Sequence, residues 1–67
     1  MFFTMYDDNQ NQYKINLEKI EFIRYNVDTK RLYIKFSNGY EIDVIDGENM
    51  YSILINIIDK YNKMKLS

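Results

Sequence analysis

The stretch Arg31–Val44, RLYIKFSNGYEIDV, decides the fold of this chain. Apolar and polar residues alternate on both sides of a short polar loop, which is the pattern of two half-buried antiparallel strands. A two-residue turn at Asn38-Gly39 would place Phe36 opposite Glu41, so that an apolar core residue would pair with a charged residue. A three-residue loop with Gly39 at a positive φ avoids this pairing. It places apolar residues opposite each other, as the pairs Phe36 with Tyr40, Ile34 with Ile42 and Leu32 with Val44. It also places Lys35 opposite Glu41.

A third strand is predicted just upstream, over Glu18–Tyr25, before the turn-like run Asn26–Lys30. If all five residues of that run form the loop, two apolar residues face the core, as the pairs Phe22 with Ile34 and Ile20 with Phe36. The same register directs other pairs away from the core: Glu21 with Lys35, Ile23 with Tyr33 and Tyr25 with Arg31. The three strands form an antiparallel meander over residues 18–45.

Two further segments complete the predicted architecture. Phe2–Tyr6 and Tyr13–Asn16 indicate an N-terminal hairpin within residues 1–16, around the polar run Asp7–Gln12. Downstream, apolar residues recur at intervals of three and four, typical of an amphipathic helix: Met50, Ile53, Leu54, Ile57, Ile58, Tyr61 and Met64. We expect this helix over residues 47–64, with Asp46 as its capping residue.

The predicted fold class is therefore α+β, in one small domain of residues 1–67. An antiparallel β-meander of three to five strands is covered on one face by a single C-terminal α-helix. Whether the N-terminal hairpin covers the other, outer face stays open at this point.

Composition excludes most catalytic chemistry. The 67 residues contain no Cys and no His, which removes thiols, imidazoles and most zinc sites. The oxygen-rich run Asp7–Asn11 lacks the spacing of a calcium-binding loop. We expect no enzyme, no catalytic residues, no cofactor and no metal. The apolar run Met50–Ile58 is far shorter than the roughly 20 residues of a membrane span, and no signal peptide is recognisable, so we expect a cytoplasmic protein.

The outer face of the meander is the predicted functional surface. Apolar and aromatic side chains there exceed what a small sheet ordinarily exposes, and Tyr and Arg are frequent interface anchors. The predicted protein-interaction residues are Ile23, Tyr25, Arg31, Tyr33, Lys35 and Ile45. We predict that the partner is a protein. Whether the chain also forms a homodimer is left open by the sequence. The formal charge of −1, and acidic residues between the basic ones, disfavour nucleic acid.

Several segments resemble one known family: Asn16–Ile23, Asp28-Thr29, Asn38-Gly39, Val44 and Ile57–Tyr61. They are similar to the FlbD/SwrD family of small flagellar proteins. The resemblance implies strands followed by a closing helix, a flagellar accessory role and no catalytic residues.

From the residues themselves we predict a small non-enzymatic module that docks on a larger protein and modulates or inhibits it. Its size and lack of chemistry also fit an inhibitor of bacterial defence encoded by a phage or mobile element. The alternatives are a flagellar accessory protein of FlbD/SwrD type and a weak nucleic-acid binder that uses the outer sheet face.

Overall fold

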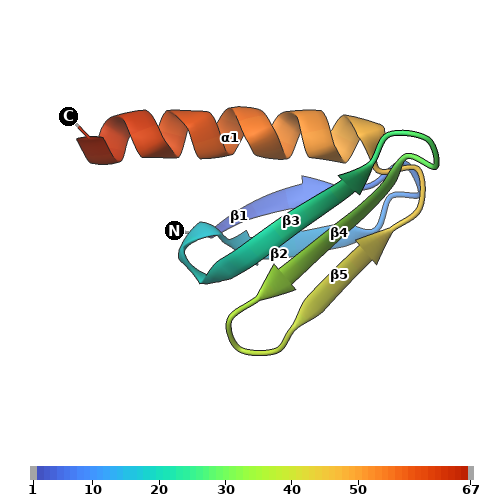
Figure 1. Cartoon of the computed structure of the whole chain (residues 1–67), viewed down its shortest axis with the longest axis horizontal. Helices are drawn as coiled ribbons and strands as arrows, with labels where there is room; N and C mark the ends of the chain where they lie inside the picture. Colours follow the sequence, from blue (N-terminus) through green and yellow to red (C-terminus); the bar gives the residue numbers. More distant parts are fainter. Residues whose placement is uncertain (1, 67) are drawn as a thin grey trace.

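The computed structural model describes residues 2–66, and the side chains of residues 2–64 (Figure 1). It contains five strands, one short 3-10 helix and one α-helix: β1 (Phe2–Tyr6), β2 (Gln12–Asn16), η1 (Leu17–Lys19), β3 (Ile20–Asn26), β4 (Arg31–Phe36), β5 (Glu41–Val44) and α1 (Glu48–Leu66). The strands form two antiparallel sheets, a hairpin β1-β2 and a meander β3-β4-β5. The predicted α+β class and the N-terminal hairpin are confirmed.

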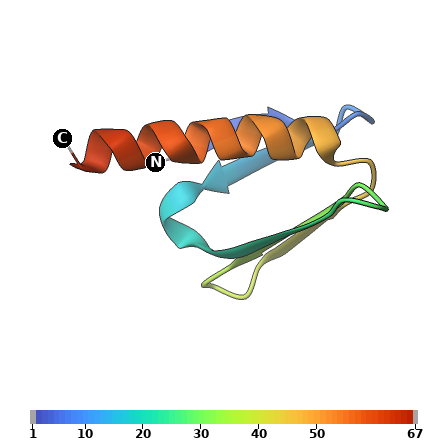
Figure 2. The ribbon, with the colours of Figure 1, turned by 45° about the horizontal axis from the view of Figure 1, so that its top comes forward.

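The two sheets and the helix are arranged in two layers. Figure 2 shows α1, in orange to red, and the hairpin, in blue, on the same side of the three-stranded sheet. The core lies between these layers, and its buried residues come from every strand except β3: Met5, Ile15, Leu17, Leu32, Ile34, Phe36, Ile42, Val44, Met50 and Leu54. The hairpin therefore shares the covered face with the helix, and no described element covers the outer face of the meander.

The β4-β5 hairpin has the predicted register. Leu32 pairs with Val44, Ile34 with Ile42 and Lys35 with Glu41. The Phe36 N–H donates to the Tyr40 carbonyl at 2.9 Å, and the Gly39 N–H donates to the Phe36 carbonyl at 3.0 Å. Gly39 has a φ of 90°, as the three-residue loop requires.

Gly39 gives a direct test of this loop. Gly39→Val is expected to destabilise the protein by about 1–2 kcal/mol, because a β-branched residue is strained at positive φ. A Cβ there would meet nothing within 4 Å, so the loss comes from the backbone and not from a collision. Gly39→Asn should cost less, since Asn tolerates this region. Urea titration of both variants measures the difference, and equal stability of Gly39→Val and the unmodified protein would contradict the loop.

The β3-β4 register differs by one residue from the prediction over most of its length. Ile23 pairs with Ile34 and Tyr25 with Leu32, so both side chains lie on the core side. The predicted pairs of Phe22, Glu21, Ile23 and Tyr25 are wrong. Ile20 still pairs with Phe36, because an irregularity between Ile20 and Phe22 absorbs the extra residue.

The shorter loop before β4 explains the shift. Asn26 pairs with Arg31, which leaves residues 27–30 as a four-residue loop. Lys30 has a φ of 61°, and its N–H donates to the Asn26 carbonyl at 2.8 Å. The Asn26 side chain accepts the Asp28 N–H at 2.9 Å and the Thr29 N–H at 3.1 Å. Asn26 therefore ends the strand and organises the loop, instead of belonging to the loop alone.

The polar run between β1 and β2 is organised by one carboxylate. Asp7 is only 7 % exposed, and it accepts hydrogen bonds from the Asn9 and Asn11 N–H groups, both at 2.9 Å. The Asn11 side chain donates to it at 2.9 Å and the Tyr13 hydroxyl at 3.0 Å. These hydrogen bonds hold the pKa of Asp7 below its usual value, and the bond from the Asn11 side chain has the largest effect. Asp7 is thus a structural residue of the turn.

The helix begins one residue later than expected. Glu48 is its first residue, and the Tyr51 N–H donates to the Gly47 carbonyl at 2.8 Å. Asp46 lies in the preceding turn with a φ of 58°, so Gly47 and not Asp46 occupies the position before the helix. The predicted cap is wrong by one residue, because the chain must turn through Asp46 before α1 can cross the sheet.

Candidate protein-interaction surface

The outer sheet face consists of the side chains of β3, β4 and β5 that point away from α1. Strand alternation places eight residues there: Phe22, Arg24, Asn26, Arg31, Tyr33, Lys35, Glu41 and Asp43. Arg24 and Tyr33 are directly paired across the strands, as are Tyr33 and Asp43. Tyr33 on the central strand therefore has neighbours on both sides.

An aromatic and cationic stack occupies the β3 side of this face. The ring centroids of Phe22 and Tyr33 lie 5.7 Å apart with an interplanar angle of 46°. The Arg24 guanidinium carbon lies 4.9 Å from the Tyr33 ring centroid, within the range of a cation–π contact. Phe22 is 42 % exposed. The stack is therefore a defined group of side chains with an accessible apolar edge.

Two polar contacts hold the β5 side. Arg31 binds Asp43 in a bidentate manner, through Nε to Oδ1 at 2.8 Å and Nη2 to Oδ2 at 3.0 Å. This pair lowers the pKa of Asp43 and raises the pKa of Arg31. The Tyr33 hydroxyl donates to Glu41 Oε1, which raises the pKa of Tyr33. Both carboxylates already have partners on the sheet.

The remaining cations of the outer sheet face are Arg24 and Lys35. Within residues 2–64, neither forms an ion pair. Three cations (Arg24, Arg31 and Lys35) and two carboxylates (Glu41 and Asp43) give this face a net charge of +1, and Arg24 lies beside the aromatic stack.

The structure places three of the six predicted interaction residues on the outer sheet face: Arg31, Tyr33 and Lys35. Ile45 directly follows β5 and is 65 % exposed at the margin of the sheet. Ile23 and Tyr25 instead pack against the core, a correction that follows from the β3 register. Phe22 and Arg24 take their place. The sequence signal was ambiguous, since β3 carries apolar residues at both alternating positions.

Tyr25 has a specific environment on the core side. Its ring stacks on Tyr51 of α1 with centroids 4.3 Å apart and planes 4° from parallel. Its hydroxyl is buried and has no hydrogen-bond partner among the described residues. The ring stabilises the contact between β3 and α1, whereas the hydroxyl opposes it, because burying an unpaired polar group is unfavourable.

Removal of that hydroxyl is expected to be stabilising. Tyr25→Phe keeps the stacked ring and should raise the free energy of unfolding by about 1 kcal/mol. A chemical denaturation curve monitored by circular dichroism measures the change. A loss of stability of about 1 kcal/mol or more would contradict the unpaired hydroxyl. Tyr51→Ala is the matched comparison, since it removes the stacking partner and should destabilise.

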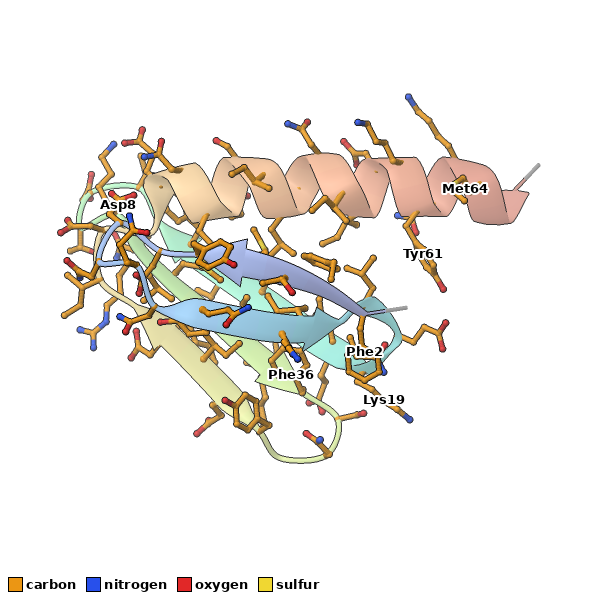
Figure 3. The ribbon with its side chains drawn as sticks, turned by 180° about the vertical axis from the view of Figure 1, so that it is seen from behind. Phe2, Asp8, Lys19, Phe36, Tyr61 and Met64 are labelled. Carbon is orange, nitrogen blue, oxygen red and sulfur yellow. The ribbon has the colours of Figure 1, made fainter. Side chains whose placement is uncertain are left out.

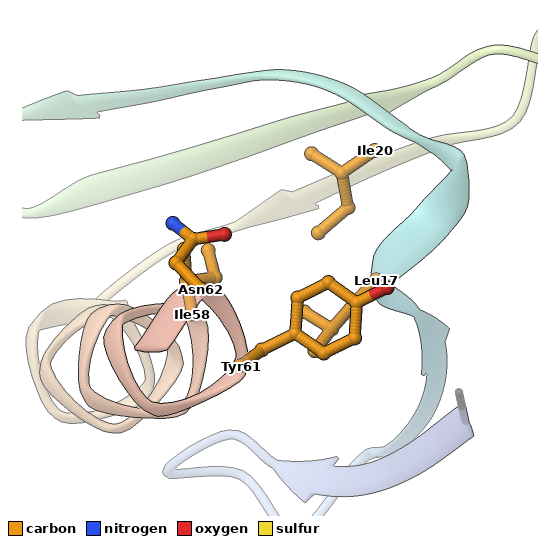
Figure 4. A pocket seen from close by; sticks show the side chains of 5 residues that line it. All are labelled: Leu17, Ile20, Ile58, Tyr61 and Asn62. Carbon is orange, nitrogen blue, oxygen red and sulfur yellow. The ribbon is translucent and has the colours of Figure 1, made fainter. Parts of the chain in front are cut away.

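The hollow between α1 and η1 offers little space for a substrate. It is lined by Leu17, Ile20, Ile58, Tyr61 and Asn62 and has a volume of about 190 Å³ (Figure 4). Ligand sites usually enclose about 300–1,000 Å³. The Tyr61 hydroxyl donates to Glu18 Oε1 at 3.4 Å and ties the helix to η1. This hollow is best explained as imperfect packing beside the helix.

Two other observations bear on function. In the described part of the chain, no cluster of three or more carboxylates is placed to hold a metal ion. Over the same residues, no helix combines the length and the apolar character needed to cross a membrane. The FlbD/SwrD resemblance stays a prediction, since no family model, curated protein or solved structure matches this chain.

Proposed function

We propose that this chain is a non-enzymatic protein-binding module that docks on a larger protein through its outer sheet face and modulates or inhibits it. The observation that supports this most is the stack of Phe22, Tyr33 and Arg24 on a face that no described element covers. Aromatic residues and Arg are the side chains most enriched among the residues that dominate binding energy at protein interfaces.

The stack fits a binding role because it is already ordered. Tyr33 is held at its ring by Arg24 and at its hydroxyl by Glu41, and Arg31 is held by Asp43. Ordering a flexible side chain on binding costs about 0.5–1.5 kcal/mol, and these contacts reduce that cost. A partner with an apolar pocket for Phe22 and carboxylates near Arg24 and Lys35 complements the face.

The size of the face indicates where else the partner makes contact. Three strands about 4.8 Å apart give a width of roughly 14 Å, and the six residues of the central strand β4 at about 3.3 Å each give a length of roughly 20 Å. A standard interface buries about 800 Å² on each side. The partner must therefore also contact the margins, where Ile45 directly follows β5 and is 65 % exposed.

The biological context has two candidates. The small size and lack of catalytic chemistry fit an inhibitor of bacterial defence carried by a phage or mobile element. The resemblance to FlbD/SwrD proteins fits a flagellar accessory role. Either role places this cytoplasmic module on a larger protein, and the outer sheet face serves both.

Affinity capture from the native host with tagged protein tests the proposal. We expect one or more proteins to bind the unmodified chain and to be lost with the double variant Phe22→Ser, Arg24→Glu. Ile53→Ser is the matched control, since Ile53 is 52 % exposed on α1, away from this face. Calorimetry with the purified partner should show affinity reduced more than about tenfold by the double variant and unchanged by the control.

Three outcomes would contradict the proposal. Equal capture by both variants would remove the outer sheet face from consideration. Loss of capture together with a lowered melting temperature of the double variant would indicate a structural role. Salt-dependent binding of a mixed-sequence oligonucleotide, abolished by the double variant, would favour the nucleic-acid alternative.

A further inference from the structure

A hollow at the open end of the two layers combines apolar walls with positive charge. Four segments meet there: β1, β2, η1 and the β4-β5 loop with its neighbouring residues. Its volume is about 260 Å³, and the lining residues that define this end hollow include Phe2, Lys14, Lys19, Phe36, Asn38 and Tyr40. Figure 3 shows Phe2, Lys19 and Phe36 at this end of the molecule. The end hollow is separate from the outer sheet face.

The apolar part of the end hollow is accessible. Phe2 is 73 % exposed and Tyr40 is 59 % exposed, whereas Phe36 is only 5 % exposed and belongs to the core. The Phe36 and Tyr40 rings are in contact, with centroids 5.8 Å apart. Phe36 thus connects the end hollow to the rigid core, and two exposed rings are available to an incoming apolar side chain.

The charge of the end hollow is positive and uncompensated. Lys14 and Lys19 both line it, and no Asp or Glu does. Among residues 2–64, neither lysine has an ion-pair partner, in contrast to Lys30, whose ammonium lies 3.5 Å from Glu48. The Asn38 Oδ1 atom accepts a hydrogen bond from the Tyr40 N–H at 3.0 Å, which fixes the loop beside Tyr40. Two free ammonium groups beside exposed rings are complementary to a carboxylate next to an apolar group.

A neighbouring hollow extends the available space. It has a volume of about 420 Å³ and shares Phe2 and Lys14 with the end hollow, continuing along β1 to Thr4. The neighbouring hollow alone lies within the range of about 300–1,000 Å³ of ligand sites, and the end hollow adjoins it. This is room for a short extended segment and not for a single ion.

We propose that the end hollow binds an acidic segment of a partner protein, with an aromatic side chain against Phe2 and Tyr40 and carboxylates at Lys14 and Lys19. The site goes beyond the proposed function, because none of its residues lies on the outer sheet face.

A protein segment fits better than a nucleic acid. The chain has a net charge of −1, and two lysines neutralise few phosphates, whereas nucleic-acid affinity grows with the number of phosphates neutralised. An acidic peptide needs only one or two charge pairs plus apolar contact. Such exposed pairs are weak individually, at about 0.2–1 kcal/mol, so the segment adds affinity to a larger contact.

Titration of the full chain with a capped peptide, Asp-Glu-Phe-Asp-Glu, tests the site by two-dimensional amide NMR at low salt. We expect a dissociation constant below about 2 mM, with shifts concentrated at Phe2, Lys14, Lys19 and Tyr40. Replacement of the central Phe of the peptide by Ala should weaken binding at least about fivefold, and a Lys-Lys-Phe-Lys-Lys peptide should not bind.

Protein variants separate this site from general charge attraction. Lys14→Glu with Lys19→Glu should weaken peptide binding at least about fivefold, whereas Lys60→Glu with Lys63→Glu, the same charge change on α1, should leave it unchanged. If the first pair fails to fold, Lys14→Gln with Lys19→Gln replaces it. Phe22→Ser should keep full peptide binding, so failure of the outer sheet face and failure of the end hollow are distinguishable.

Specific results would overturn the site. These are no binding at 5 mM peptide, equal weakening by the α1 variant, or shifts centred on the outer sheet face. Tighter binding of a single-stranded oligothymidylate than of the acidic peptide, at the same salt concentration, would assign the end hollow to nucleic acid instead.

Discussion

Leu54→Ala is expected to lower the free energy of unfolding by about 2–5 kcal/mol. Leu54 is fully buried on α1 within the core cluster that both layers share. Its truncation leaves a cavity between the helix and the meander, and neighbouring side chains fill such cavities only in part. A 67-residue domain at about 0.05–0.15 kcal/mol per residue has only about 3–10 kcal/mol in total. The variant should be largely destabilised.

Urea titration followed by circular dichroism measures this loss. Ile53→Ala is the matched control, since Ile53 is the neighbour of Leu54 in sequence but is 52 % exposed, and its truncation should change stability by less than about 1 kcal/mol. A loss below about 1 kcal/mol for Leu54→Ala would show that this side of α1 does not form the core.

Gly47→Ala is expected to destabilise the protein by about 1–3 kcal/mol, although it adds a single methyl group. A Cβ at Gly47 would lie 2.6 Å from the Leu32 Cβ and 3.4 Å from the Leu32 nitrogen. Leu32 is fully buried in the central strand, and its Cβ is attached to the backbone, so it cannot move aside. The start of α1 must shift instead, which disturbs the 2.7 Å bond from the Gly47 N–H to the Lys30 carbonyl.

The same titration, with Gly39→Ala beside it, separates collision from backbone strain. A Cβ at Gly39 meets nothing, so Gly39→Ala reports only the positive φ and should cost about 1 kcal/mol. Wild-type stability of Gly47→Ala would contradict the close approach of the helix start to β4.

The predictable parts of the fold are those where local pattern and pairing agree. The β4-β5 hairpin has one register that keeps Ile34 with Ile42 and Leu32 with Val44, and the structure has that register. Helix α1 begins one residue after the predicted start at 47, and most of the predicted apolar stripe faces the core. Ile53 and Met64 were also predicted in that stripe, but they are 52 % and 66 % exposed. In both segments only one arrangement buries the apolar residues.

The β3 register was not predictable by the same reasoning. If Ile20 and Phe22 face the core, Ile23 and Tyr25 face outward, and the reverse is also possible. Alternation alone therefore does not determine which set faces the core. The choice depends on the positive φ of Lys30, which shortens the loop, and on the irregularity between Ile20 and Phe22. In the observed register Tyr25 lies on the core side and stacks on Tyr51 of α1, a contact that strand alternation does not reveal.

The residues of the outer sheet face differ in the same way in how far the sequence predicts them. Arg31, Tyr33 and Lys35 were predictable because β4 alternates strictly. Phe22 and Arg24 were not, because their face follows from the β3 register. The position of the N-terminal hairpin on the helix side also required the packing of Met5 and Ile15 into the core. That position is what leaves the outer sheet face accessible.

Thermal melting of Phe22→Ser and Ile23→Ser, with and without the captured partner, tests the central claim most directly. These adjacent residues of β3 lie on opposite faces of the sheet, Phe22 on the outer face and Ile23 against the core. A partner that binds the folded state raises the melting temperature of every variant it still binds. The account predicts that Phe22→Ser melts near the wild type but gains little from the partner, and that Ile23→Ser melts earlier yet still gains. A partner-induced rise for Phe22→Ser equal to that of the wild type would contradict docking through the outer sheet face.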